Sequence, residues 1–330
     1  MATRLTILDN DMRSVLASHG LSRYEDFAET TVGEVVSRSS TTQTRRICWS
    51  DPPKGAANSA SDAFYLKTYR YKGATRRLAL WPDKAGLEAR NYRTLRRDCR
   101  VDVPDVVAHG SRRRWGYLLD AFILTRAIPH AVCLDDYAKR RWGTSQPSAA
   151  TKLRHRRLAG GATGGTQGPH LSSQGAKILD VDNTNHCNTE GQGAADGQAT
   201  ATTTVINDPL RRYLLTHTAD IVARMHRADF FHIDLQWRNI LIADDGSDRP
   251  GIFLIDSARG SRRQWKILQA HGRLRDLSSL SKEARSQLTP REHVLWLRRY
   301  FGVARLTQEH HAMIRTIQND RRSKDHNDPR

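Results

Sequence analysis

The chain has 330 residues and a formal net charge of +18, from 53 Lys and Arg against 35 Asp and Glu. No stretch approaches the roughly 18 consecutive apolar residues of a membrane-spanning helix, and the N-terminus lacks the apolar run of a secretion signal, so we expect a cytoplasmic protein. The cysteines are scattered without metal-ligand spacing, which argues against a zinc finger and a disulfide framework. A charge of this size predicts an anionic partner.

The first folded block is expected over residues 31–142, after an N-terminal extension over residues 1–30. The sequence of this block predicts an antiparallel meander, because β-prone runs alternate with Ser-, Thr-, Pro- and Gly-rich connections. Asp83 is the expected N-cap of a helix that continues to Arg97. Together these elements predict a small α+β lobe. The expected strands are 31–37, 44–50, 63–71 and two more in VDVPDVVAHG and RRRWGYLLDAFILTRAI.

Residues 143–204 differ sharply in composition from the rest of the chain. They contain no Phe, Tyr or Trp and are rich in Gly, Thr, Ser, Gln and Asn. Such a segment cannot bury enough apolar surface to offset the entropy lost on ordering it. We therefore expect a low-complexity disordered insertion between two folded blocks.

The second folded block is expected over residues 205–317. Asp208 and Pro209 are a cap and a first-turn proline, and they predict the start of a helix. Two apolar strands, ILIA and FLID, follow around the turn DDGSDRPG, and the chain is mostly helical from Gln264 onward. Residues 318–330 have no apolar periodicity and are expected to form a disordered tail.

The most informative stretch is HIDLQWRNILI, in which Asp234 and Asn239 stand in an H-x-D-x-x-x-x-N pattern. Asp256 ends the next apolar strand, 17 residues after Asn239. Phosphoryl transfer needs a carboxylate beside the acceptor hydroxyl and oxygen ligands for a metal ion. One H-x-D alone is more often a structural turn, but the joint order of helix, loop, strand, turn, strand and Asp favours this chemistry. We predict Asp234 as the catalytic residue and Asn239 and Asp256 as metal ligands.

These motifs resemble the protein-kinase-like superfamily, and within it the bacterial lipopolysaccharide kinases that phosphorylate Kdo or heptose of the inner core. Lys67 in AFYLKTYRY resembles the family's nucleotide-phosphate lysine, and Glu88 in GLEARNYRTL resembles the helix glutamate that pairs with it. MHRADFFHIDLQWRNILI resembles the catalytic loop, and FLIDSARG resembles the metal-binding segment. RDLSSLS, with Asp276, resembles a run found in sugar-kinase members.

The resemblance implies a two-lobed α+β fold, with a small antiparallel N-lobe sheet carrying one helix and a mainly helical C-lobe. It implies ATP and Mg²⁺ as cofactors and an anionic glycolipid or phosphorylated sugar as acceptor. The implied nucleotide-binding residues are Lys67, Glu88, Asn239 and Asp256, and Asp234 would orient the acceptor hydroxyl. The resemblance also implies that His232 holds the loop by packing and hydrogen bonding rather than reacting.

The chain departs from the superfamily pattern at two places. SRSSTTQT stands where a G-x-G-x-x-G loop would lie, so a Ser/Thr-rich turn would have to cover the phosphates. Ser257 and Ala258 replace the Phe-Gly that follows the metal-binding Asp in regulated protein kinases. We therefore do not expect switching by Phe packing.

Other functions use the same residues. A protein Ser/Thr kinase or another small-molecule kinase shares the catalytic frame, and a pseudokinase or basic binding protein at an anionic membrane shares the charge. Nucleic acid is not the expected partner, because the chain has no recognised nucleic-acid motif.

The charge is −2 over residues 205–256 and +10 over residues 257–330. We expect the latter block to face the acceptor or the inner face of the cytoplasmic membrane.

Overall fold

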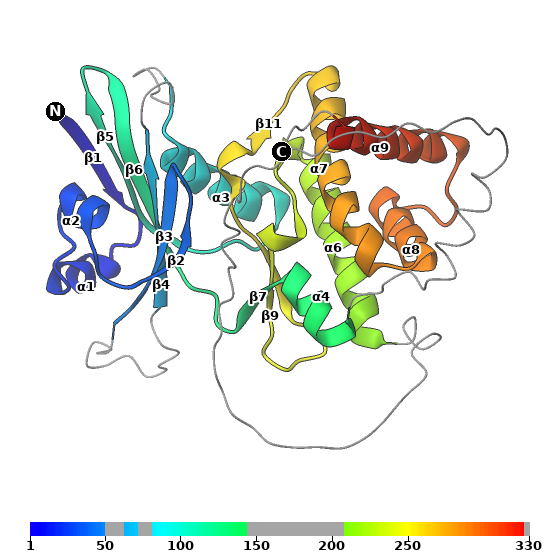
Figure 1. Ribbon diagram of the computed structural model, residues 1–330, viewed down its shortest axis with the longest axis horizontal. Helices are drawn as coiled ribbons and strands as arrows, with labels where there is room; N and C mark the ends of the chain where they lie inside the picture. The colour runs from blue at the N-terminus through cyan, green and yellow to red at the C-terminus, as the bar shows by residue number, and fades with distance from the viewer. Residues whose placement is uncertain (50–62, 72–80, 144–207, 327–330) are drawn as a thin grey trace, which may run out of the picture. The chain divides into compact units, whose positions relative to one another are not determined.

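The computed structural model describes residues 1–49, 63–71, 81–143 and 208–326 (Figure 1). All but the first residue of the insertion expected at 143–204 lies outside these described residues. Within them, no helix combines the length and the apolar character needed to cross a membrane.

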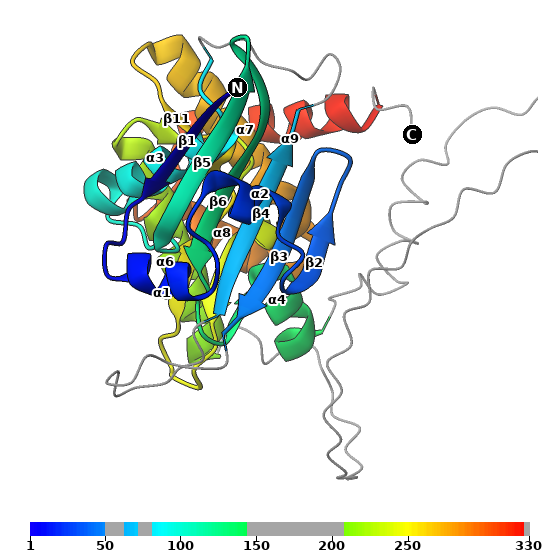
Figure 2. The same cartoon turned by 90° about the vertical axis from the view of Figure 1, so that its left-hand side faces the viewer.

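A six-stranded antiparallel sheet forms the N-lobe, in the order β1-β5-β6-β4-β3-β2 (Figure 2). The five predicted strands are present, and β1 adds a sixth. Because side chains alternate along β4, Phe64 and Leu66 join one core cluster while Tyr69 joins another on the opposite face. The strands are β1 Ala2–Ile7, β2 Glu34–Arg38, β3 Thr42–Cys48, β4 Ala63–Arg70, β5 Val106–Arg114 and β6 Tyr117–Arg126.

Residues 1–30, expected to precede the lobe as an extension, contribute directly to it. Strand β1 pairs with β5 along one edge of the sheet. Helices α1 (Met12–Ser18) and α2 (Tyr24–Glu29) bury Leu16 and Phe27 against the sheet, where Phe27 stacks on Phe122 with ring centroids 4.5 Å apart. The N-lobe thus has two helices besides the predicted one, because short amphipathic segments bury their apolar residues on the otherwise open face.

The helix predicted from Asp83 is α3 (Lys84–Cys99). The Asp83 carboxylate accepts a hydrogen bond of 2.6 Å from the Gly86 N–H and so caps the helix as expected. The helix ends two residues beyond the predicted Arg97, where Arg100 takes a left-handed φ of 53°. Its buried residues recur at helical spacing and include Glu88, which therefore faces the sheet.

The C-lobe is mainly helical, and its first long helix is α6 (Pro209–Arg227). The predicted cap is confirmed, since the Asp208 carboxylate accepts hydrogen bonds from the N–H groups of Leu210 and Arg211. The other elements are β7 Ala131–Cys133, α4 Leu134–Trp142, β8 Phe230–Phe231, η3 Trp237–Asn239, β9 Ile240–Ala243, β10 Gly251–Leu254, η4 Ser257–Arg259, β11 Ser261–Arg262, α7 Lys266–Gln287, α8 Pro290–Phe301 and α9 Gln308–His326.

The C-terminal helix α9 extends further than the sequence predicts. We expected structure to end at residue 317, but α9 continues to His326. Once a helix has formed, each added residue contributes a backbone hydrogen bond without a new nucleation step, so an apolar face is not required in the last turns.

The two lobes share one core cluster. It runs from Leu95 on α3 and Ile123 on β6 to Ile221 on α6 and Leu254 on β10. A parallel bridge between Asp102 and Phe253 adds a backbone link between the lobes. This shared packing fixes the strand that carries Lys67 relative to the turn that carries Asp256.

Candidate active site

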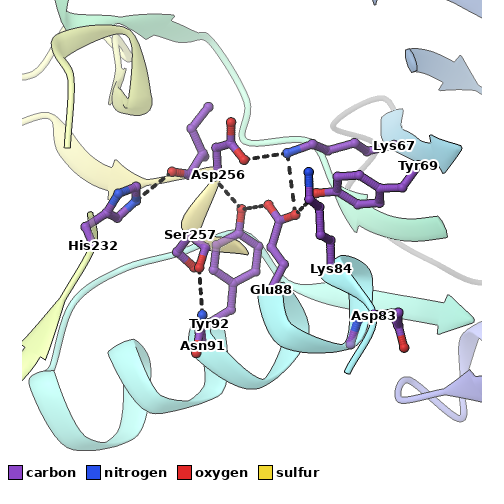
Figure 3. A network of polar contacts seen from close by, with 12 residues as sticks. Lys67, Tyr69, Asp83, Lys84, Glu88, Asn91, Tyr92, His232, Asp256 and Ser257 are labelled. Carbon is purple, nitrogen blue, oxygen red and sulfur yellow. Dashed lines mark hydrogen bonds and ion pairs between the residues drawn. The ribbon is translucent and has the colours of Figure 1, made fainter. Parts of the chain in front are cut away.

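The centre of the site is an ion-pair cluster that joins three separate segments (Figure 3). Lys67 on β4 lies 2.7 Å from the Asp256 carboxylate and 3.4 Å from the Glu88 carboxylate. The structure therefore brings together the lysine, the helix glutamate and the second aspartate that the sequence analysis singled out. The Asp256 side chain is 43% exposed, whereas that of Glu88 is 3% exposed, so Asp256 alone of the two presents its carboxylate to solvent.

Two tyrosines hold Glu88 in place. Tyr69 and Tyr92 each donate a hydroxyl hydrogen bond to its carboxylate, and the Tyr92 bond is 2.9 Å long. The Tyr92 oxygen also accepts a hydrogen bond of 3.0 Å from the Asp256 backbone N–H. Burial and the adjacent Glu88 carboxylate raise the pKa of both tyrosines well above its usual range, so they remain donors.

The charges in the cluster stabilise one another. Burial lowers the pKa of Lys67, but the carboxylates of Glu88 and Asp256 outweigh it, and the pKa is raised overall. Burial likewise raises the pKa of Asp256, but attraction to Lys67 outweighs it, and the pKa is lowered overall. The lysine is therefore cationic and Asp256 anionic near neutral pH, which are the states that bind phosphate and a divalent cation.

The turn that follows Asp256 is tied to α3 by Asn91. Its side-chain amide donates a hydrogen bond of 2.7 Å to the backbone carbonyl of Ser257 (Figure 3), and another of 2.7 Å to that of Gly260. Asp256 itself takes a left-handed backbone conformation, with φ 58°. Ser257 is fully buried. The Ser-Ala pair that replaces Phe-Gly is thus held by amide hydrogen bonds rather than by packing of a large aromatic ring.

A buried carboxylate fixes the loop that carries Asp234. Asp276 on α7 is fully buried and accepts hydrogen bonds from the backbone N–H groups of His232 and Ile233, at 2.8 and 2.6 Å. Ile233 has a φ of 70°, a left-handed conformation that is costly for a β-branched residue. The two hydrogen bonds hold the loop in this conformation.

His232 packs in the core and holds the loop from a second side. It is fully buried, and its Nε2 atom lies 2.9 Å from the Ile255 carbonyl oxygen, immediately before Asp256. The histidine thereby connects the loop of Asp234 to the strand end of Asp256. This agrees with the structural role implied for it by the family resemblance.

Asp234 and Asn239 lie next to each other in the loop. The Asn239 side-chain N–H donates a hydrogen bond of 2.8 Å to the Asp234 carbonyl, and Gln236 donates one of 2.7 Å to the Asp234 carboxylate. The backbone N–H of Ile255 donates to the Asn239 carbonyl at 3.0 Å. The amide orientation of Asn239 leaves its Oδ1 oxygen as the atom able to coordinate a cation.

These oxygen donors fit Mg²⁺. Asn239 supplies one amide oxygen and Asp256 one partly exposed carboxylate, whose charge Lys67 maintains. Mg²⁺ is commonly bound by one or two such protein ligands, with phosphate oxygens and water completing its coordination. The pair can therefore hold a magnesium ion that arrives with a nucleotide.

The Ser/Thr-rich turn that would cover the phosphates lies between β2 and β3. The Ser39 hydroxyl accepts hydrogen bonds from the backbone N–H groups of Thr41 and Thr42, at 3.4 and 3.1 Å. The Ser39 N–H donates to the Thr42 carbonyl at 2.7 Å. Three backbone N–H groups of the turn therefore already have partners within it, and a phosphate would have to compete for them.

The sequence analysis missed Tyr69, Tyr92 and Asn91, and it gave Asp276 no structural task. A signal for the tyrosines was available: Tyr69 lies two residues after Lys67 on a strand, and Tyr92 lies four residues after Glu88 on a helix, so each shares a face with its partner. The contacts of Asn91 and Asp276 span 166 and 44 residues, and no local spacing indicates them.

Comparisons with known proteins show which families and folds this chain resembles. Residues 193–313 match the sequence model of the Lipopolysaccharide kinase (Kdo/WaaP) family. Among solved structures, WaaP in complex with acyl carrier protein is similar over 97% of this chain and 98% of that chain, with 17% identity and a TM-score of 0.56. A rhoptry antigen kinase domain from Toxoplasma gondii matches over 70% of this chain and 49% of that chain, with 12% identity and a TM-score of 0.31. No curated protein matches the sequence. The expected kinase-like fold is confirmed by the likeness to WaaP.

Proposed function

We propose that this chain is a kinase of the lipopolysaccharide (Kdo/WaaP) type, which transfers the γ-phosphoryl group of ATP to a sugar hydroxyl of a lipopolysaccharide inner core, because residues 193–313 match the sequence model of that family. The observation that carries the proposal is the cluster in which Lys67 contacts both Glu88 and Asp256. It lies beside the loop that carries Asp234 and Asn239, linked through Ile255. Kdo and heptose are the acceptor sugars to compare.

In the proposed mechanism, Lys67 binds the α and β phosphates and Glu88 keeps the lysine in position. Asn239 and Asp256 would hold Mg²⁺, which would supply positive charge to offset that of the phosphates. Asp234 accepts a hydrogen bond from the acceptor hydroxyl. The hydroxyl oxygen forms a bond to the γ phosphorus as the bond to the ADP oxygen breaks, and the hydroxyl proton passes to Asp234.

The location of the charge supports an acceptor at a membrane surface. The +10 charge of residues 257–330 follows directly on Asp256. Each Lys or Arg near an anionic leaflet contributes about 1 kcal/mol to association. We therefore place the protein in the cytoplasm, peripherally attached to the inner face of the cytoplasmic membrane, where ATP and a lipid-linked acceptor are both accessible.

An acyl carrier protein is a further proposed partner. WaaP, to which this chain is similar, was solved in complex with one. In this chain, α4, α6, α7, α8 and α9 line a cavity of about 580 Å³. The cavity has a mainly apolar lining that includes Leu214, Val222, Leu280 and Ile317, and an acyl chain fits such a lining. Co-purification of the full chain with acylated, but not unacylated, carrier protein would support the partnership.

The decisive experiment for the proposed function is a thermal-shift assay with Mg·ATP. Ligand binding stabilises only a competent site, so Mg·ATP should raise the melting temperature of the wild type but not of Asp256→Ala. Asp248→Ala is the matched control, because Asp248 is an exposed aspartate in the β9–β10 turn. Equal Mg·ATP stabilisation of all three proteins would contradict the nucleotide site.

The acceptor is tested by turnover. We expect ATP-dependent phosphorylation of a Kdo- or heptose-containing core oligosaccharide and none of a Ser/Thr peptide. Activity on the peptide alone would favour a protein kinase. Nucleotide binding without transfer to either acceptor would favour a pseudokinase.

A further inference from the structure

The start of α7 carries a group of large apolar side chains exposed to water. Trp265 is 74% exposed, Ile267 84% and Leu268 48%. They belong to residues 261–268, which run from β11 into the first turn of α7. We call these residues the α7 entry segment (Figure 1). A cluster of this kind is typical of a surface that meets a second apolar phase.

The surroundings of these side chains are strongly basic. Residues 257–275 contain six Lys and Arg residues and no Asp or Glu. Arg262, Arg263 and Lys266 belong to the α7 entry segment itself, and Lys266 is exposed. Arg262 has one acidic contact, an ion pair of 3.0 Å with Asp98 on α3. An apolar tip beside several cations complements a surface with negative headgroups over a hydrocarbon layer.

The α7 entry segment is held in a defined conformation. Its strand β11 pairs with β8, and the Arg263 N–H donates a hydrogen bond of 3.0 Å to the Asp229 carbonyl. The Arg263 guanidinium donates to the Leu268 carbonyl at 3.0 Å, and the Gln269 amide donates to the Arg263 carbonyl at 2.8 Å. Its apolar side chains are thus presented outward from an ordered backbone, which reduces the entropy lost on docking.

The stability of α7 does not explain why a tryptophan stands at position 265. It occupies the N-cap of α7 without a side-chain hydrogen bond to the first turn. Ser, Thr, Asp and Asn are the residues that stabilise this position, because their side chains accept such a bond. The indole instead extends into water, in the way that tryptophans at membrane interfaces extend into the headgroup layer.

We propose that the α7 entry segment docks on an anionic bilayer. Trp265, Ile267 and Leu268 enter the headgroup layer, while the neighbouring cations contact lipid phosphates. The segment begins five residues after Asp256. Docking here would hold the site near a membrane-bound acceptor, and in that respect the inference rests on the proposed function. The high exposure indicates protruding side chains, which favours a bilayer over a protein groove.

The first test is flotation of the full chain with vesicles. The wild type should bind phosphatidylglycerol vesicles and should bind phosphatidylcholine vesicles less. Trp265→Ser combined with Ile267→Ser should weaken binding to the anionic vesicles by about tenfold or more, since affinity scales with buried apolar area. Lys266→Gln should weaken it about fivefold on anionic vesicles, and not on neutral ones.

The matched control is Trp115→Ser combined with Val32→Ser, which removes a tryptophan and an aliphatic residue that are 84% and 57% exposed on the N-lobe. It should leave flotation unchanged. An equal loss in both double variants would overturn the proposal, because binding would then follow general hydrophobicity. The proposal would also fail if Trp265→Ser with Ile267→Ser floated normally but lost binding to acyl carrier protein.

The second test separates docking from chemistry. On an acceptor embedded in vesicles, the Trp265→Ser, Ile267→Ser variant should lose turnover in proportion to its lost binding. On the same acceptor deacylated and in solution, it should match the wild type, and loss of turnover there would overturn the proposal. A wild type that floats with vesicles but phosphorylates neither acceptor would contradict the proposed function and still support the docking surface.

Discussion

The ion-pair cluster and the loop of Asp234 hold their charged residues in different ways. In the cluster, side chains hold side chains: Lys67 and Asp256 are 189 residues apart and meet at 2.7 Å. In the loop, one buried carboxylate holds the backbone: Asp276 accepts two main-chain N–H groups. The cluster joins the lobes, whereas the loop lies wholly within the C-lobe.

The difference indicates which perturbations each region tolerates. The contact between Lys67 and Asp256 is partly screened by water, because the Asp256 side chain is 43% exposed, and it contributes modestly to stability. A fully buried acceptor of backbone hydrogen bonds cannot be removed without leaving polar groups unpaired. We therefore expect substitution of Asp256 to affect nucleotide binding more than folding, and substitution of Asp276 to affect folding.

The largest effect is expected at Asp234, where chemistry and stability should separate. Asp234→Asn removes the proposed proton acceptor, so kcat should fall by about 10²–10⁴-fold. The KM for ATP should stay near the wild-type value, and the melting temperature should not fall. Steady-state kinetics with the core acceptor checks this prediction. A fall in kcat of less than tenfold would assign the proton to another group.

The next effect is expected beneath the loop. Asp276→Asn retains the size of the side chain but replaces one acceptor oxygen with a donor, so one buried N–H loses its partner. The free energy of unfolding should fall by about 1–3 kcal/mol, measured by urea denaturation. Asp220→Asn is the control, because Asp220 on α6 makes an ion pair with a half-exposed arginine, Arg299. Equal destabilisation by both changes would contradict the role of Asp276.

A smaller effect should distinguish the two tyrosines. The Tyr92 hydroxyl contacts both Glu88 and the Asp256 N–H, whereas the Tyr69 hydroxyl contacts only Glu88 among these groups. Tyr92→Phe should therefore cost about 1–3 kcal/mol of stability and Tyr69→Phe less, and only the former should also raise the KM for ATP. A larger KM effect for Tyr69→Phe would reverse this assignment.

The smallest effect concerns pH. The pKa of Asp256 is lowered from its ordinary value of 3.8, so its contribution to stability is present above that pH and is lost as the pH falls through the folded-state pKa. The pKa of Lys67 is raised from 10.5, so its contribution is present below that pH and is lost as the pH rises further. Unfolding free energies across this range should show a shallower acid-side decline in Asp256→Asn. An unchanged acid-side slope would contradict the pairing.

Much of the site was predictable from residue order. The spacing of Asp234, Asn239 and Asp256 placed these groups on one loop and one strand end, and the structure has them there. Local patterns also predicted the caps at Asp83 and Asp208, because a cap depends only on residues within one helical turn. The same local signal could have found Tyr92 from Glu88.

The order of strands and the long-range contacts were not predictable in this way. The sequence by itself determined which residue types stand in which element, since hydrophobic periodicity and caps act over a few positions. Only the tertiary structure decided that residues 1–30 complete the N-lobe sheet, that Asn91 ties α3 to the turn of Asp256, and that Asp276 lies beneath the catalytic loop. These contacts depend on packing between distant segments, and the same polar residues at an exposed position would have bonded to water instead.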